Sequence, residues 1–450
     1  MNTKDKMPKG IPYILGNELA ERFSYYGMKT ILVIFMTQHL MDAAGNSAYM
    51  SEAESKVWYH TFLTGNYFFP ILGALLADIL WGKYRTIIVL SLLYCCGHLA
   101  LAMDETRLGL SLGLTMIALG AGGIKPCVSA HVGDQFTKGN QHLLGKVYNL
   151  FYLSINLGSM VSIILTPMLM KHYGSSVAFG VPGGLMMVAT IVFWFGRDKY
   201  TTVPPTGFKQ YKEEWKKPEV QKSLMGLLVV YLFYSVFWSL YDQHGSAWVL
   251  QANSPYMNKH IDLTFGIFHY DWLRFEMLPD QLQAINPVFV LIFVPLFAFY
   301  FYPFLTKKFN ITPLGKVSVG MFLMALSFVI VAMAENLIQH KIEVSILWQA
   351  FAFVVLTASE VMVYGTGLEF SYAQAPTSMK SLVMGMYMLS ISMGNLITAL
   401  VNQFIQNADG TSKLEGASYY WFFVWFMVVT AIGFIFIAKN YKGKSYVQEA

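Results

Sequence analysis

The sequence predicts an all-α membrane protein with twelve transmembrane helices in two six-helix bundles. Of its 450 residues, 55% are hydrophobic and only 13% are charged, with a mean hydropathy of +0.46. Soluble domains average about 25% charged residues. Apolar stretches long enough to cross about 30 Å of hydrocarbon recur along the whole chain. Lys and Arg are concentrated in alternate connections between these stretches, as the positive-inside rule expects of a multi-pass protein.

The predicted spans follow one another with short connections. They are residues 11–38, 56–80, 84–103, 108–132, 144–170, 177–196, 223–250, 284–305, 313–334, 344–370, 381–406 and 417–438. The connections on one side hold about three times as many basic residues as those on the other, which places both termini in the cytoplasm.

The domain organisation follows from the longest cytoplasmic connection. Residues 197–222 divide the chain into an N-terminal bundle, residues 1–196, and a C-terminal bundle, residues 223–450. We expect this segment to be a tether, and the alternative is that its basic residues also contact anionic lipid.

Several other classes of protein are disfavoured by the sequence. Cys95, Cys96 and Cys127 lie in apolar stretches and suggest neither a disulfide framework nor a metal site. The net charge of +5 comes from short loops, so no nucleic-acid partner is expected. No zinc-ligand spacing, phosphate loop or nucleophile elbow occurs, and no cleavable signal peptide is apparent. We therefore expect neither an enzyme nor a bound cofactor.

The first predicted span carries a polar stripe. At 100° per residue, its ionisable groups and two tyrosines fall on one face of the helix. They are Glu18, Glu21, Arg22, Tyr25, Tyr26 and Lys29. A charge at the bilayer centre costs roughly 2.5–3.5 kcal/mol if it is unpaired, so the stripe must face water or partner helices. Glu18 and Arg22 are four residues apart and can pair within the helix. The stripe is either a lock between helices or part of a substrate or proton path, and we favour the path.

Further ionisable groups are distributed over other spans. Lys125 lies in a Gly- and Pro-rich part of the fourth span and needs either a carboxylate partner or a depressed pKa. The tenth span offers Glu360 and Glu369 as partners. Asp242 lies in a polar run of the seventh span. His60, about one turn into the second span, is either a solvated interfacial ring or a group that titrates in the working cycle. Position alone leaves both open.

Five motifs resemble those of known transporters. Residues 73–85, between the second and third spans, resemble the loop motif of the major facilitator superfamily. Residues 18–27 resemble the first-span signature of the proton-coupled oligopeptide transporters. Residues 123–136, 151–159 and 369–376 are similar to the motifs of that family's fourth, fifth and tenth spans. The resemblance extends over the whole chain, and it implies the major facilitator fold.

The resemblance also implies roles for single residues. Glu18, Glu21 and Arg22 would form a proton-linked cluster, Lys125 would pair with Glu369, and His60 would titrate in the cycle. Lys29 and Asp242 would form an extracellular gate pair. The proton-coupling and peptide-binding residues would together comprise Glu18, Glu21, Arg22, Tyr25, Tyr26, His60, Tyr67, Lys125, Asn156, Trp238, Glu369 and Ser371.

The function implied is proton-coupled import of di- and tripeptides across the cell (inner) membrane by a monomer in the lipid bilayer. The fixed cations and carboxylates suit the two ends of a peptide zwitterion. The alternatives are transport of another small solute, such as an amino acid, nitrate or a drug, and a peptide sensor that does not transport. The chain departs from animal members of the family at Gly226 and Ala298, where those members have an Arg–Asp pair. The cytoplasmic gate must therefore close in another way.

Overall fold

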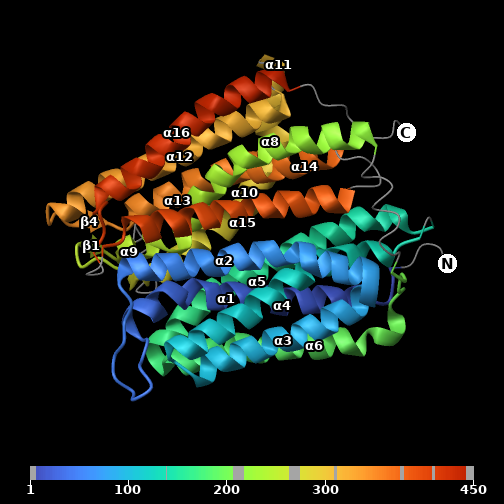
Figure 1. Cartoon of the computed structure of the whole chain (residues 1–450), viewed down its shortest axis with the longest axis horizontal. Coiled ribbons are helices and arrows are strands. Elements are labelled where there is room, and N and C mark those ends of the chain that lie inside the picture. Colours follow the sequence, from blue (N-terminus) through green and yellow to red (C-terminus); the bar gives the residue numbers. More distant parts are fainter. Residues whose placement is uncertain are drawn as a thin grey trace, which may run out of the picture.

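The chain forms long helices that run beside one another along the longest axis of the molecule (Figure 1). The structure is a computed structural model that describes residues 7–137, 139–205, 217–262, 274–308, 312–374, 380–407 and 411–441. Part of the predicted tether, residues 206–216, lies outside the described residues, as do residues 375–379 at the end of the tenth-span motif.

The first half of the chain folds into six long helices. They are α1 (Ile11–Gln38), α2 (Glu52–Leu75), α3 (Lys83–Met103), α4 (Arg107–Asp134), α5 (Leu144–Tyr173) and α6 (Ser175–Phe195). A π-helical turn, Leu76–Trp81, extends α2, and Gly82 then reverses the chain with a positive φ of 75°. Glycine adopts this backbone conformation without the steric cost that other residues incur. These helices cover the six predicted spans of the first half.

The second half contains more broken helices. They are α8 (Pro218–Tyr241), α9 (Ala247–Ala252), α10 (Ile285–Leu296), α11 (Tyr302–Lys308), α12 (Pro313–Gln339), α13 (Leu347–Glu360), α14 (Thr366–Gln374), α15 (Lys380–Ile405) and α16 (Ala417–Asn440). The span predicted at 223–250 lies within one membrane-span candidate, Gln221–Ala252, in which a 3₁₀ turn at Asp242–Gly245 separates α8 from α9. π-Helical turns at Phe297–Phe301 and Val361–Gly365 interrupt two further predicted spans. Pro295, which has no N–H for the helix ladder, lies two residues before the first of these turns.

The described residues include eleven helical segments that are long and apolar enough to cross a membrane. Helix α1, with 28 residues, is not among them, since it carries four charged residues, Glu18, Glu21, Arg22 and Lys29. At 1.5 Å per residue, a helix of this length extends about 42 Å. α1 packs against α5 and α6, which are both membrane-span candidates.

Buried apolar side chains form two clusters, one mainly from each half of the chain, and Val249 and Leu250 of α9 belong to the cluster of the first half. The helices from residues 11–195 occupy the lower part of Figure 1, and most of those from residues 218–440 occupy the upper part. The two groups meet most extensively where α2 lies against α15. The functional side chains described below lie along this boundary.

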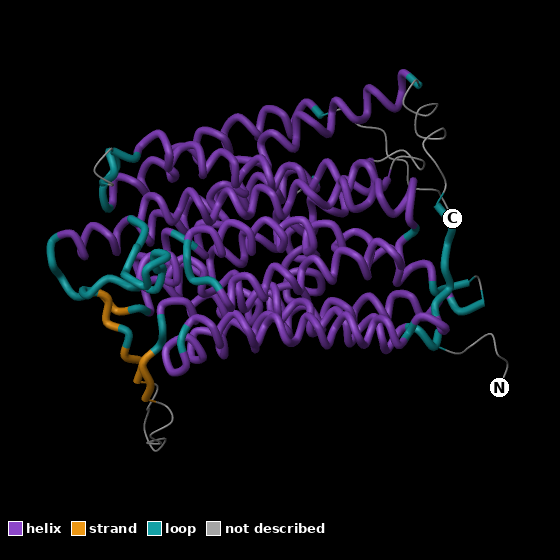
Figure 2. The backbone as a smooth tube through the Cα atoms, turned by 60° about the horizontal axis from the view of Figure 1, so that its bottom comes forward, coloured by secondary structure: helices purple, strands orange, loops and turns teal. Residues whose placement is uncertain are grey.

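Short strands mark one end of the helices, which we call the strand end (Figure 2). There β1 (Met257–Asn258) pairs in parallel with β4 (Val344–Ser345), with Met257 opposite Val344. β2 (His260–Asp262) pairs antiparallel with β3 (Arg274–Glu276). A 3₁₀ helix, Pro279–Ala284, leads from β3 into α10. Helix α1 ends and α2 begins at the strand end, whereas α1 begins and α16 ends at the opposite end.

Close helix packing positions the side chains of α4 against those of α2. A Cβ atom on Gly73 of α2 would lie 2.1 Å from the carbonyl oxygen of Gly123 in α4, so the two backbones are nearly in contact. Small residues permit this approach between membrane helices. As a result, Lys125, two residues after Gly123, lies beside Tyr67 of α2.

Candidate functional site

The charged residues of α1 form a buried cluster. Arg22 Nε lies 2.6 Å from Glu18 Oε1 and 2.9 Å from Glu21 Oε2. Both glutamate residues are 1% exposed. The contact with Glu18 is a hydrogen bond, whereas neither carboxylate oxygen of Glu21 has a hydrogen-bond partner among the described residues. One guanidinium therefore serves two carboxylates, which makes Glu21 the less firmly held of the two.

Lys125 is held by aromatic rings. Its Nζ lies 4.3 Å from the centre of the Tyr25 ring and 4.7 Å from that of Tyr67. Electron-rich ring faces attract an ammonium group without supplying a hydrogen-bond acceptor. Asn66 Nδ2 donates to the Tyr25 hydroxyl over 2.8 Å and fixes that ring in place. The half-buried ammonium thus keeps its hydrogen-bonding capacity for another group.

The expected pairing of Lys125 with Glu369 is not formed in this structure. Glu369 lies on α14 with its side chain exposed, and it forms no ion pair with Lys125. The other carboxylate of the tenth predicted span, Glu360, is located between the two halves. It interacts electrostatically with Tyr26 of α1 and Tyr241 of α8. A π-helical turn, Val361–Gly365, lies between the two glutamates.

The remaining predicted peptide-binding residues differ in their accessibility. Tyr26 and Tyr67 are partly exposed, and Tyr25 is buried. Trp238 is buried edge-on to Tyr241 and Tyr364.

Two of the predicted peptide-binding residues bond to their own helices. Asn156 Nδ2 donates to the Tyr152 carbonyl within α5. Ser371 is fully buried, and its hydroxyl donates to the Gly367 carbonyl of α14. The expectation that Ser371 lines a binding site therefore finds no support in this geometry.

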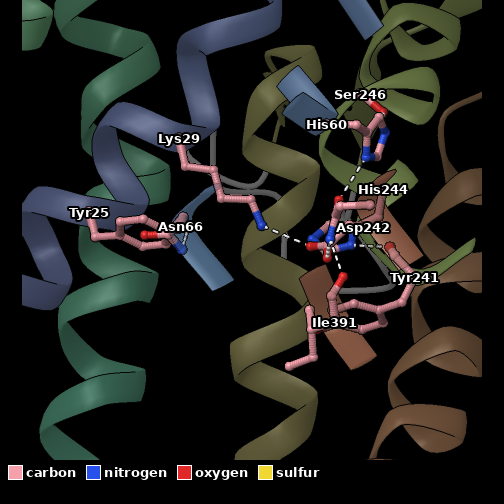
Figure 3. A network of polar contacts seen from close by, with 10 residues as sticks. Tyr25, Lys29, His60, Asn66, Tyr241, Asp242, His244, Ser246 and Ile391 are labelled. Carbon is pink, nitrogen blue, oxygen red and sulfur yellow. Dashed lines mark hydrogen bonds and ion pairs between the residues drawn. The ribbon is translucent and has the colours of Figure 1, made fainter. Parts of the chain in front are cut away.

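A buried polar network joins the two halves near the strand end (Figure 3). Lys29 Nζ of α1 lies 3.2 Å from Asp242 Oδ1, and Asn395 Nδ2 of α15 donates to Asp242 Oδ2 over 2.7 Å. His60 Nδ1 lies 2.8 Å from Asn395 Oδ1, and its Nε2 lies 2.9 Å from the Ser246 hydroxyl. All five residues are at least nine-tenths buried. The two residues predicted as a gate pair are thus in contact, within a larger network.

The network determines which nitrogen of His60 carries a proton. The Asp242 carboxylate and the Ile391 carbonyl can only accept hydrogen bonds, so the Asn395 group that faces them is its NH₂. Asn395 Oδ1 therefore faces His60 and accepts from Nδ1–H. A neutral ring then accepts from the Ser246 hydroxyl at Nε2. The expected alternative of a solvated interfacial ring was wrong, because His60 is 0% exposed.

Several functional neighbours were not expected from the sequence. Asn66 and Ser246 were not singled out, although each polar side chain occurs in a predicted span. Asn286, which donates to Glu360 Oε2 over 2.6 Å, was also missed. The available signal was a polar residue in an apolar segment, but many such residues bond only to their own backbone, as Asn156 does.

Polar contacts between the halves gather toward the strand end. Besides the network, the Ser392 hydroxyl donates to the Thr64 carbonyl, and Gln281 Nε2 donates to the Ile164 carbonyl. Toward the opposite end, Lys125 and Glu369 are not paired. Among the described residues, side-chain polar contacts therefore join the two halves toward the strand end. A site between the halves that is closed at one end is suited to alternating access.

Comparison with known proteins gives consistent matches. A family model described as the POT family matches residues 84–214 and 207–422. The chain is 38% identical over 385 residues to solute carrier family 15 member 2 of Rattus norvegicus, covering 74% of this chain and 50% of that protein. It is 37% identical over 374 residues to peptide transporter family 1 of Drosophila melanogaster, covering 73% and 48%. The chain thus spans about half the length of these relatives.

Solved structures match over nearly the full length. An auto-inhibited POT family peptide transporter has a TM-score of 0.85 and 31% identity, with 98% of this chain and 99% of that chain covered. The POT family transporter PepTSo, solved in meso, has a TM-score of 0.85 and 32% identity, with 97% and 98% covered. The arrangement of helices is therefore that of these transporters.

Proposed function

Because the chain belongs to the POT family of membrane transporters, we propose that it is a proton-coupled symporter that imports di- and tripeptides by alternating access. Its relatives are transporters rather than enzymes, and a proton gradient takes the place of a cofactor. The alternative functions, transport of another solute and peptide sensing, are outcomes of the test below.

The proposal includes a membrane topology. Helix α1 also spans the membrane and brings the number of spans to twelve. Its charged groups are satisfied by each other and by neighbouring helices. Residues 1–196 and 223–450 are two bundles that move relative to one another, and residues 197–222 tether them. The strand end faces outward, both termini are cytoplasmic, and the chain works as a monomer in the cell (inner) membrane. The positive-inside bias of the sequence supports this orientation.

The observation that carries the proposal is the set of charges around Lys125. A peptide zwitterion needs a cation for its carboxylate, and Lys125 has an ammonium group stacked on two rings with no acceptor bonded to it among the described residues. The amino end needs a carboxylate, and Glu360 lies between the halves for this role. Tyr26 and Tyr67 are partly exposed and accept varied side chains through apolar contact.

Proton coupling is assigned to the α1 cluster and His60. Glu21 shares Arg22 with Glu18 and accepts no hydrogen bond from the described residues. Protonation of Glu21 therefore disrupts fewer contacts than protonation of Glu18. Protonation leaves Arg22 with Glu18 alone and alters the charge near Lys125. His60, neutral while the strand end is closed, gains access to outside protons when its contacts with Asn395 and Ser246 separate.

Uptake by proteoliposomes tests the proposed function. The purified protein should accumulate alanyl-alanine when an inward proton gradient is imposed, and accumulation should stop when the gradient is removed. Glu276→Gln, at an exposed position in β3, serves as a matched control and should behave like the parent.

Three results would contradict proton-coupled peptide transport. Binding of the dipeptide without accumulation would identify a sensor. Accumulation of free alanine but not alanyl-alanine would identify a transporter of another solute. Equal accumulation with and without the gradient would refute proton coupling.

A further inference from the structure

A cavity of about 520 Å³ lies at the strand end, apart from Lys125 and Glu360. One wall is the first turn of α2, with Glu52, Ala53 and Lys56. The other wall comes from the second half of the chain, with α9, the end of α12, residues 411–416 and the start of α16. The two halves therefore share this cavity, which has no part in the transport scheme above.

A buried lysine lines the cavity. Lys56 is 8% exposed, and its Nζ lies 4.1 Å from the centre of the Tyr419 ring. Among the described residues, no acceptor receives a hydrogen bond from this ammonium and no carboxylate lies within ion-pair distance. A buried ammonium with three free donors is costly to maintain unless another group meets it. The donors are available to a ligand in the cavity.

Carboxylates lie on both walls of the cavity, Glu52 on the α2 wall and Glu335 and Glu415 on the wall from the second half. Glu335 is half-buried, and its Oε2 accepts from Gln251 Nε2 over 2.7 Å. Glu52 and Glu415 are exposed at the margin of the cavity. With Lys56, these groups sum to two negative charges, so the cavity favours a ligand with more cationic than anionic groups.

We propose that the strand-end cavity is a second binding site, for a small zwitterion with one additional positive charge. Its carboxylate meets Lys56, and its ammonium groups meet Glu335 and the two exposed carboxylates. A dipeptide with a lysine side chain and free lysine share this chemistry. A ligand that contacts both walls stabilises the state in which the strand end is closed. If such peptides are the transported substrates, high outside concentrations of them slow their own uptake. This consequence rests on the proposed function.

Calorimetric titration of the full-length protein in detergent tests the site. Alanyl-lysine should bind to the parent at two sites, the transport site and the strand-end cavity. Lys56→Gln removes the cation but keeps the size and polarity of the side chain, and this variant should bind one molecule. The binding event that remains shows that the variant is folded. Lys413→Gln, an exposed lysine outside the cavity lining, is the matched control and should bind two.

Further titrations test which groups the strand-end cavity recognises. Glu335→Gln keeps the acceptor for Gln251 and should weaken the second event about tenfold, as expected for loss of a charge-assisted contact. Alanyl-glutamate should bind once to the parent. If L-lysine also binds in a Lys56-dependent way, the cavity accepts free amino acids as well as peptides. If it does not, the cavity is specific for peptides.

Uptake measurements add an independent readout. In the parent, uptake of alanyl-lysine should pass through a maximum as its outside concentration rises, whereas Lys56→Gln and Glu335→Gln should saturate without a decline. Equal stoichiometry in the parent and Lys56→Gln would overturn the second site. Loss of gradient-driven uptake in the parent would overturn the proposed function instead, because a Lys56-dependent binding event would persist without it.

Discussion

The buried pair of Lys29 and Asp242 provides a quantitative test of how the strand end is held closed. Their side chains are only 6% and 2% exposed, and Nζ lies 3.2 Å from Oδ1. Removing one member of a buried pair strands the other charge and costs about 3–5 kcal/mol. Because Asn395 still donates to Asp242, we expect Lys29→Met to fall near the lower limit, about 3 kcal/mol.

This free-energy cost destabilises only the conformation in which the strand end is closed. Lys29 belongs to α1, and Asp242 follows α8, so their contact exists only while the two halves meet at the strand end. A penalty of about 3 kcal/mol changes the equilibrium between closed and open strand ends about a hundredfold. Lys29→Met with Asp242→Leu removes both charges and should restore most of the closed population.

Distances between spin labels measure this equilibrium. Labels at Ala44 and Glu343 sit on exposed positions of the two halves at the strand end. Cys96 is replaced by serine first, since it is the exposed cysteine, whereas the other two cysteines are buried. Lys29→Met should shift the distance distribution toward longer values. An unchanged distance distribution in Lys29→Met would refute this reasoning. So would a double variant in which the shifts of the two single variants simply add.

Three further predictions concern single ionisable groups. Glu21→Gln should abolish gradient-driven accumulation yet retain peptide exchange across the bilayer. Full uphill transport by this variant would refute the assignment of Glu21 to proton coupling. Glu360→Gln should reduce the rate of alanyl-alanine uptake at least about tenfold, because a charged contact is lost. Glu369→Gln, at an exposed position, should stay near the parent rate. If Glu369→Gln instead shows the larger loss of uptake, Glu369 is the carboxylate of the peptide site. His60→Gln cannot titrate near neutral pH, so uptake measured between about pH 5 and 8 should lose the pH dependence of the parent, and an identical profile would make the His60–Asn395 contact structural only.

The boundaries of most helices could be read from the sequence because the membrane imposes length and composition directly. The span predicted at 11–38 coincides with α1, and 417–438 lies within α16. The pairing of Glu18 with Arg22 was likewise local, since four residues along a helix bring two side chains onto one face. Such features depend only on helical periodicity and on the cost of charge in hydrocarbon.

The breaks within the second-half helices could not be read in this way. The turn at Asp242–Gly245 and the π-helical turn after Glu360 both lie inside apolar segments long enough to span a membrane, so an average over a window passes over them. These turns decide which polar side chains face the other half of the protein. The pairing of Lys125 with Glu369 came from the resemblance to the tenth-span motif, and in this structure Glu369 is exposed and unpaired with Lys125.

By itself, the sequence determined that this chain crosses a membrane repeatedly, which residues form most of the spans, and that the charged groups must be satisfied inside the protein. Those properties follow from local periodicity and solvation energy, which each segment carries alone. Only the tertiary structure decided which buried group meets which: His60 with Asn395 and Ser246, and Lys125 with two tyrosine rings rather than Glu369. The physical reason is that a buried polar atom accepts any partner of suitable geometry, and helices distant in sequence supply several.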